Sequence, residues 1–301
     1  MEINLKINKK MNQSTIKILV PIDFSDQSFS GLRQAKYIAQ GRDVKIIALH
    51  VVRENIPPWN FFDESEKKTY VGKIHEKLRM LSETEKIDPE QFSTLVLFGK
   101  LCDTILLAAE KTEVDCIIMG TTAASNIKKK IIGSNALRIV AESDIPVITV
   151  KVGCETDNFS NLILPLDLAK ETREKVPLAI RIAKLLGSTI KAVSLVSTSD
   201  EQVITNLKNQ MALVVEYIAS REMACTGEVI QYSGKSRKQK MLNYSKKNPG
   251  MILITTHQQP ELIEFLLGSF AADLVNAAKF PVMSIIPSGI IKYASKMPGI
   301  Q

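Results

Sequence analysis

The stretch Lys17-Ile-Leu-Val-Pro-Ile-Asp23 is the best guide to the architecture, because a close copy of it returns later in the chain as Asn161-Leu-Ile-Leu-Pro-Leu-Asp167. Both stretches are short apolar runs that end in Pro-x-Asp, and their aspartates are 144 residues apart. An apolar run of this kind is typical of a strand buried on both faces, as in a parallel sheet covered by helices. Such internal repetition determines the architecture. The two runs therefore predict one α/β unit that is present twice.

Further matches extend the repeat along the chain. The same offset of 144 residues aligns 35–39 with 179–183 and 46–51 with 190–195. Later the offset falls to 135 residues, which aligns Gly99 with Gly234 and Gly133 with Gly268. The change predicts about nine extra residues after the second strand of the first copy, within the segment 52–65.

Each copy is predicted to alternate five strands with helices. The expected strands are 16–22, 44–51, 92–98, 116–119 and 147–150 in the first copy, and 162–166, 190–195, 227–232, 251–254 and 282–286 in the second. Parallel neighbours need crossover helices, so this alternation indicates a doubly wound sheet. The sequence therefore predicts two tandem α/β domains with five-stranded parallel sheets, at residues 14–152 and 160–290, joined by a linker at 153–158.

Composition excludes several classes of protein. No stretch of about 18 uncharged apolar residues occurs, and the first residues are polar and basic, so we expect neither a membrane partner nor a secretory signal. The net charge of +7 comes from lysines spread along the chain, which does not favour a nucleic-acid partner. The four cysteines lack CxxC spacing, which is typical of reduced thiols in the cytoplasm and not of a zinc site.

A candidate ligand site gathers where the predicted strands of the first copy end. Asp23 follows strand one, Val51 closes strand two, and Gly120 follows strand four. Gly120 begins Gly120-Thr-Thr-Ala123, and nine residues later comes Gly133-Ser134, directly before a predicted helix. In an open parallel sheet, ligands bind outside the carboxyl ends of the strands. A helix start offers free N–H groups to phosphate oxygens, and glycine removes the Cβ that would block a close approach.

This pattern resembles the universal stress protein family, which has Gly-x2-Gly-x9-Gly-Ser/Thr after strand four and an aspartate after strand one. Ala123 stands where the family has its second glycine, and the nine-residue spacing is kept. The resemblance covers both copies and implies an adenine nucleotide alpha hydrolase-like fold. It also implies that the first copy binds ATP, with Mg²⁺, through these residues: Asp23, Val51, Gly120, Thr121, Ala123, Gly133, Ser134 and Asn135.

The second copy departs further from the family pattern. It keeps Asp167 and the pair Gly268-Ser269, but Thr255 and Gln258 stand where the two earlier glycines belong. Nucleotide binding is therefore expected in the first copy, at about one nucleotide per chain. Simple helix capping would also account for Asp23 and for Gly133-Ser134, without any ligand.

Three functions remain open at this point. The first is a cytoplasmic, non-enzymatic stress-response protein that binds or senses an adenine nucleotide. The second is an interaction module without nucleotide, formed as an internal pseudo-dimer of the two copies, with further homo-oligomers left open. In both, the final strands, 147–150 and 282–286, are expected to pair, because they would otherwise be exposed apolar edges. The third is a slow ATPase, which the sequence disfavours because no general base, nucleophile pair or metal cluster accompanies the glycines.

Overall fold

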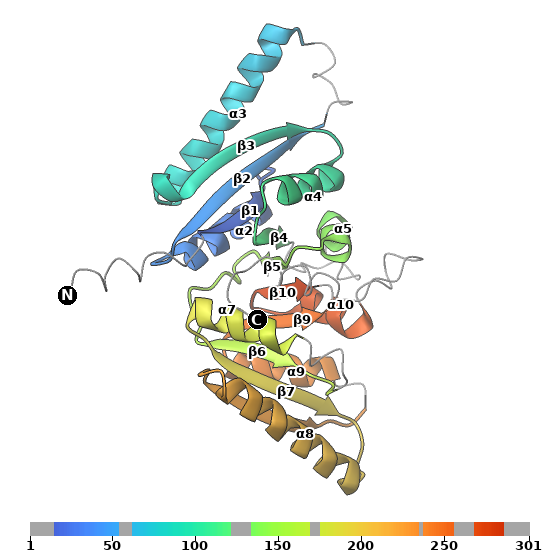
Figure 1. Ribbon diagram of the computed structural model, residues 1–301. Helices are drawn as coiled ribbons and strands as arrows, with labels where there is room; N and C mark the ends of the chain where they lie inside the picture. The colour runs from blue at the N-terminus through green and yellow to red at the C-terminus, as the bar shows by residue number, and fades with distance from the viewer. Residues whose placement is uncertain are drawn as a thin grey trace, which may run out of the picture.

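The computed structural model, shown in Figure 1, describes residues 15–53, 62–121, 134–168, 175–234, 237–255 and 268–285. The first unit contains β1 (Ile16–Pro21), α2 (Asp26–Ala39), β2 (Val44–Val52), α3 (Glu64–Thr84), a 3-10 turn (Pro89–Gln91), β3 (Phe92–Phe98), α4 (Leu101–Lys111), β4 (Cys116–Thr121), α5 (Ser134–Glu142) and β5 (Val147–Lys151). The second unit contains β6 (Asn161–Pro165), α7 (Val176–Leu186), β7 (Thr189–Val196), α8 (Glu201–Ala219), β8 (Cys225–Gln231), α9 (Arg237–Lys247), β9 (Gly250–Thr255), α10 (Gly268–Ala277) and β10 (Val282–Ile285).

The ten strands form one sheet in the order β3-β2-β1-β4-β5-β10-β9-β6-β7-β8. Each unit contributes five mutually parallel strands, and the order within the second unit repeats that of the first. The predicted α/β class with a doubly wound, mostly parallel sheet is therefore confirmed.

The two units meet at their last strands. β5 and β10 pair antiparallel, with Met283 opposite Ile148 at the centre of three register pairs. The Thr149 hydroxyl also donates a hydrogen bond to the carbonyl of Val282, at 3.3 Å. This is the pairing of final strands that the sequence predicts, and it turns two apolar edges into one continuous sheet.

Helices cover both faces of this sheet, which is why the middle of its first strand is apolar. In β1, Ile18, Leu19 and Val20 are fully buried. Leu19 packs in the core layer with α4, α5, α9 and α10, whereas Ile18 and Val20 pack in the layer with α2, α3, α7 and α8. Successive strand residues point to opposite faces, so the covered part of such a strand needs apolar residues on both faces.

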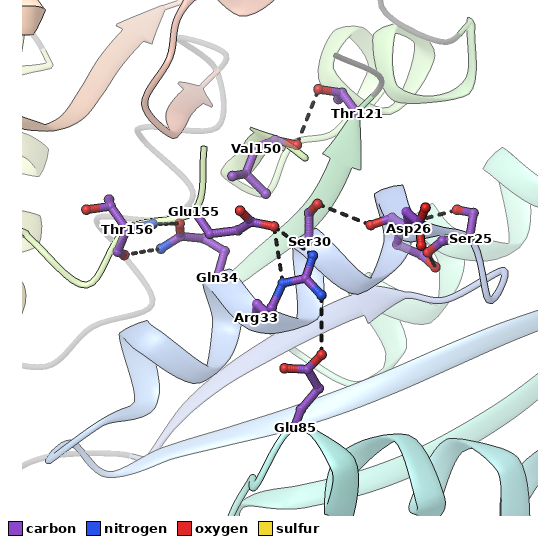
Figure 2. Close-up of polar contacts among 11 residues, drawn as sticks. Ser25, Asp26, Ser30, Arg33, Gln34, Glu85, Thr121, Val150, Glu155 and Thr156 are labelled. Carbon is purple, nitrogen blue, oxygen red and sulfur yellow. Dashed lines mark hydrogen bonds and ion pairs between the residues drawn. The ribbon is translucent and has the colours of Figure 1, made fainter. Parts of the chain in front are cut away.

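The segment between the units is held against α2, as Figure 2 shows. Arg33 donates to the carboxylate of Glu155 at 2.9 Å and to that of Glu85 at 3.3 Å. The buried amide of Gln34 makes reciprocal hydrogen bonds of 3.1 and 3.0 Å with the backbone of Thr156. The predicted linker is thus a docked segment with a defined path.

The connection from β2 to α3, residues 53–63, is longer than the one from β7 to α8, residues 197–200. The extra length therefore lies where the change of offset predicts it. Several predicted features lie outside the described residues: most of that extra segment, the loop that contains Ala123 and Gly133, and the tail after Pro287.

Candidate functional site

A pocket of about 310 Å³ lies at the carboxyl ends of β1, β2 and β4. The chain runs from β1 to β2 on one side and later returns to β4 on the other side, so the pocket lies where the strand order reverses. Its size falls at the lower end of the range typical of small-molecule sites. Its lining consists of Pro21, Ile22, Asp23, Ser25, Gln27, Ser28, Leu49, His50, Val51, Leu101, Ile105, Met119, Gly120, Thr121, Asn135 and Ala136.

Asp23 follows β1 and is fixed by the start of α2. Its carboxylate accepts hydrogen bonds from the Ser25 backbone at 3.0 Å and from the Ser25 hydroxyl at 2.5 Å. Ser25 is in turn the N-cap of α2, where its hydroxyl oxygen accepts from the Ser28 N–H. Partial burial acts to raise the pKa of Asp23, but the hydrogen bonds from Ser25 and Ser28 outweigh it, so the pKa lies below its usual value. Asp23 is therefore an ionised, oriented acceptor at the pocket wall.

Val51 offers backbone groups to the pocket. The Ile22 N–H donates to the carbonyl of Leu49 at 2.7 Å, while β1 has already ended at Pro21. Backbone orientation alternates along a strand, so Val51 points its N–H and C=O to the same side as Leu49. On that side β1 no longer runs beside it. The Val51 backbone therefore faces the space that the pocket occupies.

The turn after β1 is strained and well packed. Phe24 has a φ of 63°, which is uncommon for a residue with a large side chain. Its ring lies 5.1 Å from that of His50, and the Lys77 ammonium lies 4.2 Å from its centroid. The His50 Nδ1 lies 2.7 Å from the carbonyl oxygen of Ile22, so Nδ1 carries the proton and donates. These contacts fix the turn that presents Asp23.

Glycine is required at position 120 for a structural reason that differs from the expected one. A Cβ at this position would lie 1.5 Å from the carbonyl oxygen of Gln27, in the first turn of α2. Glycine is thus required because α2 packs against the end of β4. The close approach that the sequence assigned to a ligand is made, at the position of the Cβ, by the chain's own helix.

Three helices begin at the pocket. Its lining includes Gln27 of α2, Leu101 of α4 and Asn135 of α5, and each of these residues lies in the first turn of its helix. Free N–H groups and the helix dipole favour negative charge at such a place. The Thr121 hydroxyl instead donates to the carbonyl of Val150 at 3.3 Å, as Figure 2 shows.

Five of the eight predicted site residues line this one pocket: Asp23, Val51, Gly120, Thr121 and Asn135. Ser134 is described as the exposed first residue of α5, next to Asn135. Ala123 and Gly133 lie outside the described residues. Sequence reasoning missed the lining residues of α2 and α4, although Ser25 carries the signal of a helix start.

The described residues contain neither a group of three or more His, Cys, Asp or Glu side chains placed to hold a metal ion nor a helix long and apolar enough to cross a membrane.

Comparison with known proteins relates the first unit to one family. Residues 16–151 match the model of the universal stress protein family. The chain is 29% identical over 140 residues to universal stress protein MJ0531 of Methanocaldococcus jannaschii, an alignment that covers 45% of this chain and 81% of that protein.

Solved structures extend the likeness to both units. The structure of a universal stress protein from Archaeoglobus fulgidus covers 91% of this chain and 100% of that chain, with a TM-score of 0.70 at 17% identity, which shows the fold. The structure of the universal stress protein from Archaeoglobus fulgidus in complex with dAMP covers 42% of this chain and 98% of that one, with a TM-score of 0.35 at 19% identity. Residues 16–151, a little under half of the chain, therefore carry a universal stress protein domain.

Proposed function

We propose that the first unit binds an adenine nucleotide, ATP with Mg²⁺, and that the protein acts as a cytoplasmic nucleotide sensor of the stress response without turnover. The observation that carries this proposal is the pocket itself, which brings five predicted site residues from separate parts of the chain to one place. We also propose that the family domain extends over residues 14–152, that residues 160–290 form a second one, and that the two make an internal pseudo-dimer.

The pocket lining favours a nucleoside at its inner end. Leu49, Ile105 and Met119 supply apolar walls for a flat base, and Asp23 supplies an ionised acceptor for hydroxyl or amino groups. The Val51 backbone adds a donor and an acceptor. Phosphates would then extend toward Ser134 and the first turn of α5, where helix N–H groups favour negative charge.

The same geometry supports binding without hydrolysis. Hydrolysis needs an oriented water and positive charge at the γ-phosphate. The described lining of the pocket carries one carboxylate, Asp23, which belongs to the nucleoside end and is already held by Ser25. Occupancy would then follow nucleotide concentration, as a sensor requires.

A pure interaction module is the second candidate, and Gly120 favours it. Because the carbonyl of Gln27 fills the space beside Gly120, this glycine has a full explanation without a ligand. Described residues of the pocket lining include neither lysine nor arginine to balance a triphosphate. In that case the joined sheet, and not the pocket, would carry the function.

Calorimetric titration of the full chain separates the two candidates. ATP, AMP and adenosine are titrated with and without Mg²⁺, and we expect saturation near one nucleotide per chain. Asp23→Asn should weaken binding, whereas Asp167→Asn, the matched change in the second unit, should leave it unchanged. Phosphate release under single-turnover conditions should stay far below about 1 s⁻¹. No heat with any of the three ligands would favour the interaction module.

A further inference from the structure

A second cavity lies beside the place where the two units meet. Its volume is about 410 Å³, and its lining comes from α9, from the last turn of α10 with the residues that follow it, and from the end of β5. Leu242, Ala278 and Phe280 supply an apolar part of the lining. Four lysines also line it, and we call the space the basic cavity: Lys151, Lys238, Lys246 and Lys279.

The basic cavity carries a net positive charge. Lys238 forms an ion pair with Asp273 at 2.6 Å, and the Lys151 ammonium donates to a backbone carbonyl at the end of α10. Lys246 and Lys279 are exposed, and neither has an ion-pair partner within the described part of the chain. The described lining contains neither aspartate nor glutamate. An apolar space is therefore bordered by positive charge.

An ion pair shows how the repeat treats this region. In the first unit, Asp103 of α4 lies 2.6 Å from Arg138 of α5. The offset of 135 residues assigns Asp103 to Lys238 and Arg138 to Asp273, which form the ion pair between α9 and α10. The two helix pairs thus keep the same bridge with its charges exchanged.

The counterpart of the basic cavity is an acidic face. The same offset assigns five residues of the cavity lining to five exposed residues of the first unit, which we call the acidic face: Asp103, Leu107, Glu110, Glu142 and Asp144. Asp103, Leu107 and Glu110 follow the spacing of one side of α4. The Leu107 side chain belongs to a residue with 53% of its surface exposed. Arg138 and Lys111 offset two of the four carboxylates, so the face remains net negative.

The acidic face and the basic cavity lie on the same face of the sheet. Helices α4, α5, α9 and α10 all pack in one core layer. A single twofold axis between two copies can therefore bring the acidic face of each copy onto the basic cavity of the other. In this arrangement Leu107 meets the apolar lining, and the carboxylates around it meet the lysines.

We propose that the protein forms a reciprocal homodimer, in which the acidic face of each copy docks on the basic cavity of the other. Charge selects this partner, because two acidic faces or two basic cavities would repel each other. The contact is distinct from the pairing of β5 with β10 inside one chain. None of its residues lines the pocket of the first unit, so the proposal goes beyond nucleotide binding and does not depend on it.

Sedimentation of the full chain over a range of concentrations tests the proposal. We expect a dimer of twice the 33.4 kDa of one chain, with a dissociation constant that rises roughly 10-fold or more when salt screens the charges. Leu107→Ser should weaken association by roughly 10- to 100-fold. Leu213→Ser is the matched control, at an exposed leucine of α8 on the opposite face of the sheet, and should associate as the wild type does.

A mixing experiment tests whether the contact is reciprocal. Ala277→Glu combined with Lys279→Asp gives the cavity the acidic residues of its counterpart, and this double variant should be monomeric. Mixed with Leu107→Ser, at a concentration where neither associates alone, it should form a one-to-one complex. One chain then supplies an intact cavity and the other an intact acidic face.

Three results overturn the proposal. The first is a wild-type protein that stays monomeric up to roughly 0.1 mM, including one whose cavity binds tripolyphosphate without any dimer. The second is unchanged association of Leu107→Ser. The third is a mixture that recovers no complex, which would mean that each surface contacts its own kind. Nucleotide titration of the same variants should match the wild type in every case.

Discussion

The two units share a backbone fold and differ in the side chains at the ends of their strands. Both turn after their first strand at a Pro-x-Asp sequence, and the following residue has a positive φ in each, 63° at Phe24 and 65° at Leu168. At the end of the fourth strand, however, the first unit has Gly120 and the second has Thr255. Duplication has therefore kept the backbone of the strand ends, while a few positions around them have changed the chemistry.

The largest effect is expected when the two units are separated, because separation removes the pairing of β5 with β10. Residues 14–152 and 160–290, expressed separately, each expose an apolar final strand that β5 and β10 cover in the full chain. We expect each half to self-associate or aggregate and the mixture to recover a one-to-one complex, measured by sedimentation. Two soluble, folded monomers would show that the pairing of β5 with β10 is dispensable.

Exchanging the residues at the end of the fourth strand should reveal the next largest effect. Gly120→Thr places a Cβ 1.5 Å from the Gln27 carbonyl position, so α2 must shift, and the free energy of unfolding should fall by roughly 3 kcal/mol or more. The reciprocal Thr255→Gly should cost about 1 kcal/mol. Chemical denaturation measures both. Equal losses would contradict the asymmetry between the units.

The glycine at the start of the last helix of each unit should distinguish the two units by their effect on ATP affinity. Gly133→Asp puts a carboxylate where phosphate oxygens are proposed to lie, and ATP affinity should fall by roughly 100-fold or more. Gly268→Asp, the matched change, should leave ATP affinity within about twofold, since little ATP is expected there. Calorimetry of both variants decides this. Similar losses from the two changes would mean two equivalent nucleotide sites.

Another expected effect is the dependence of stability on pH through Lys175. Burial lowers its pKa to about 8 in the folded chain, from an ordinary value of 10.5, while Asp167 and Arg237 act on it from neighbouring elements. Between these values the unfolded chain binds the extra proton, so the stability of the wild type rises with pH. Lys175→Met, which removes this buried charge, should therefore be more stable than the wild type below about pH 8, and the difference should shrink by on the order of 3 kcal/mol toward pH 10. Lys184→Met, at an exposed lysine of α7, should show no such trend.

The sequence predicts the strands and their ends well, because these depend on local patterns of residues. Pro-x-Asp after an apolar run marks the end of a buried strand, and parallel strands bring their carboxyl ends to one edge, so Asp23, Val51 and Gly120 could be grouped in advance. The reason for Gly120 could not, because the carbonyl of Gln27 reaches it only through the packing of α2 on β4.

The burial of Lys175 and of the Arg237 Nε atom escaped sequence analysis for a physical reason. Lys175 ends the run Lys170-Glu-Thr-Arg-Glu-Lys175, whose composition is typical of an exposed helix start. Arg237 lies among Lys235, Lys238 and Lys240, which also indicates an exposed surface. Burial of one cation within such a run depends on the three-dimensional path of the chain, and the sequence pattern carries no signal for it.

The antiparallel seam between β5 and β10 sets the directions from which ligands can arrive. All strands of the first unit run one way and all strands of the second run the opposite way, so their carboxyl ends lie at opposite edges of the continuous sheet. The pocket of the first unit and the corresponding strand ends of the second unit therefore lie at opposite edges of the sheet. A small ligand cannot bridge them, and neither site raises the effective concentration of ligand at the other. Any communication between ligands bound at these two places would have to pass through the shared sheet and the segment docked on α2.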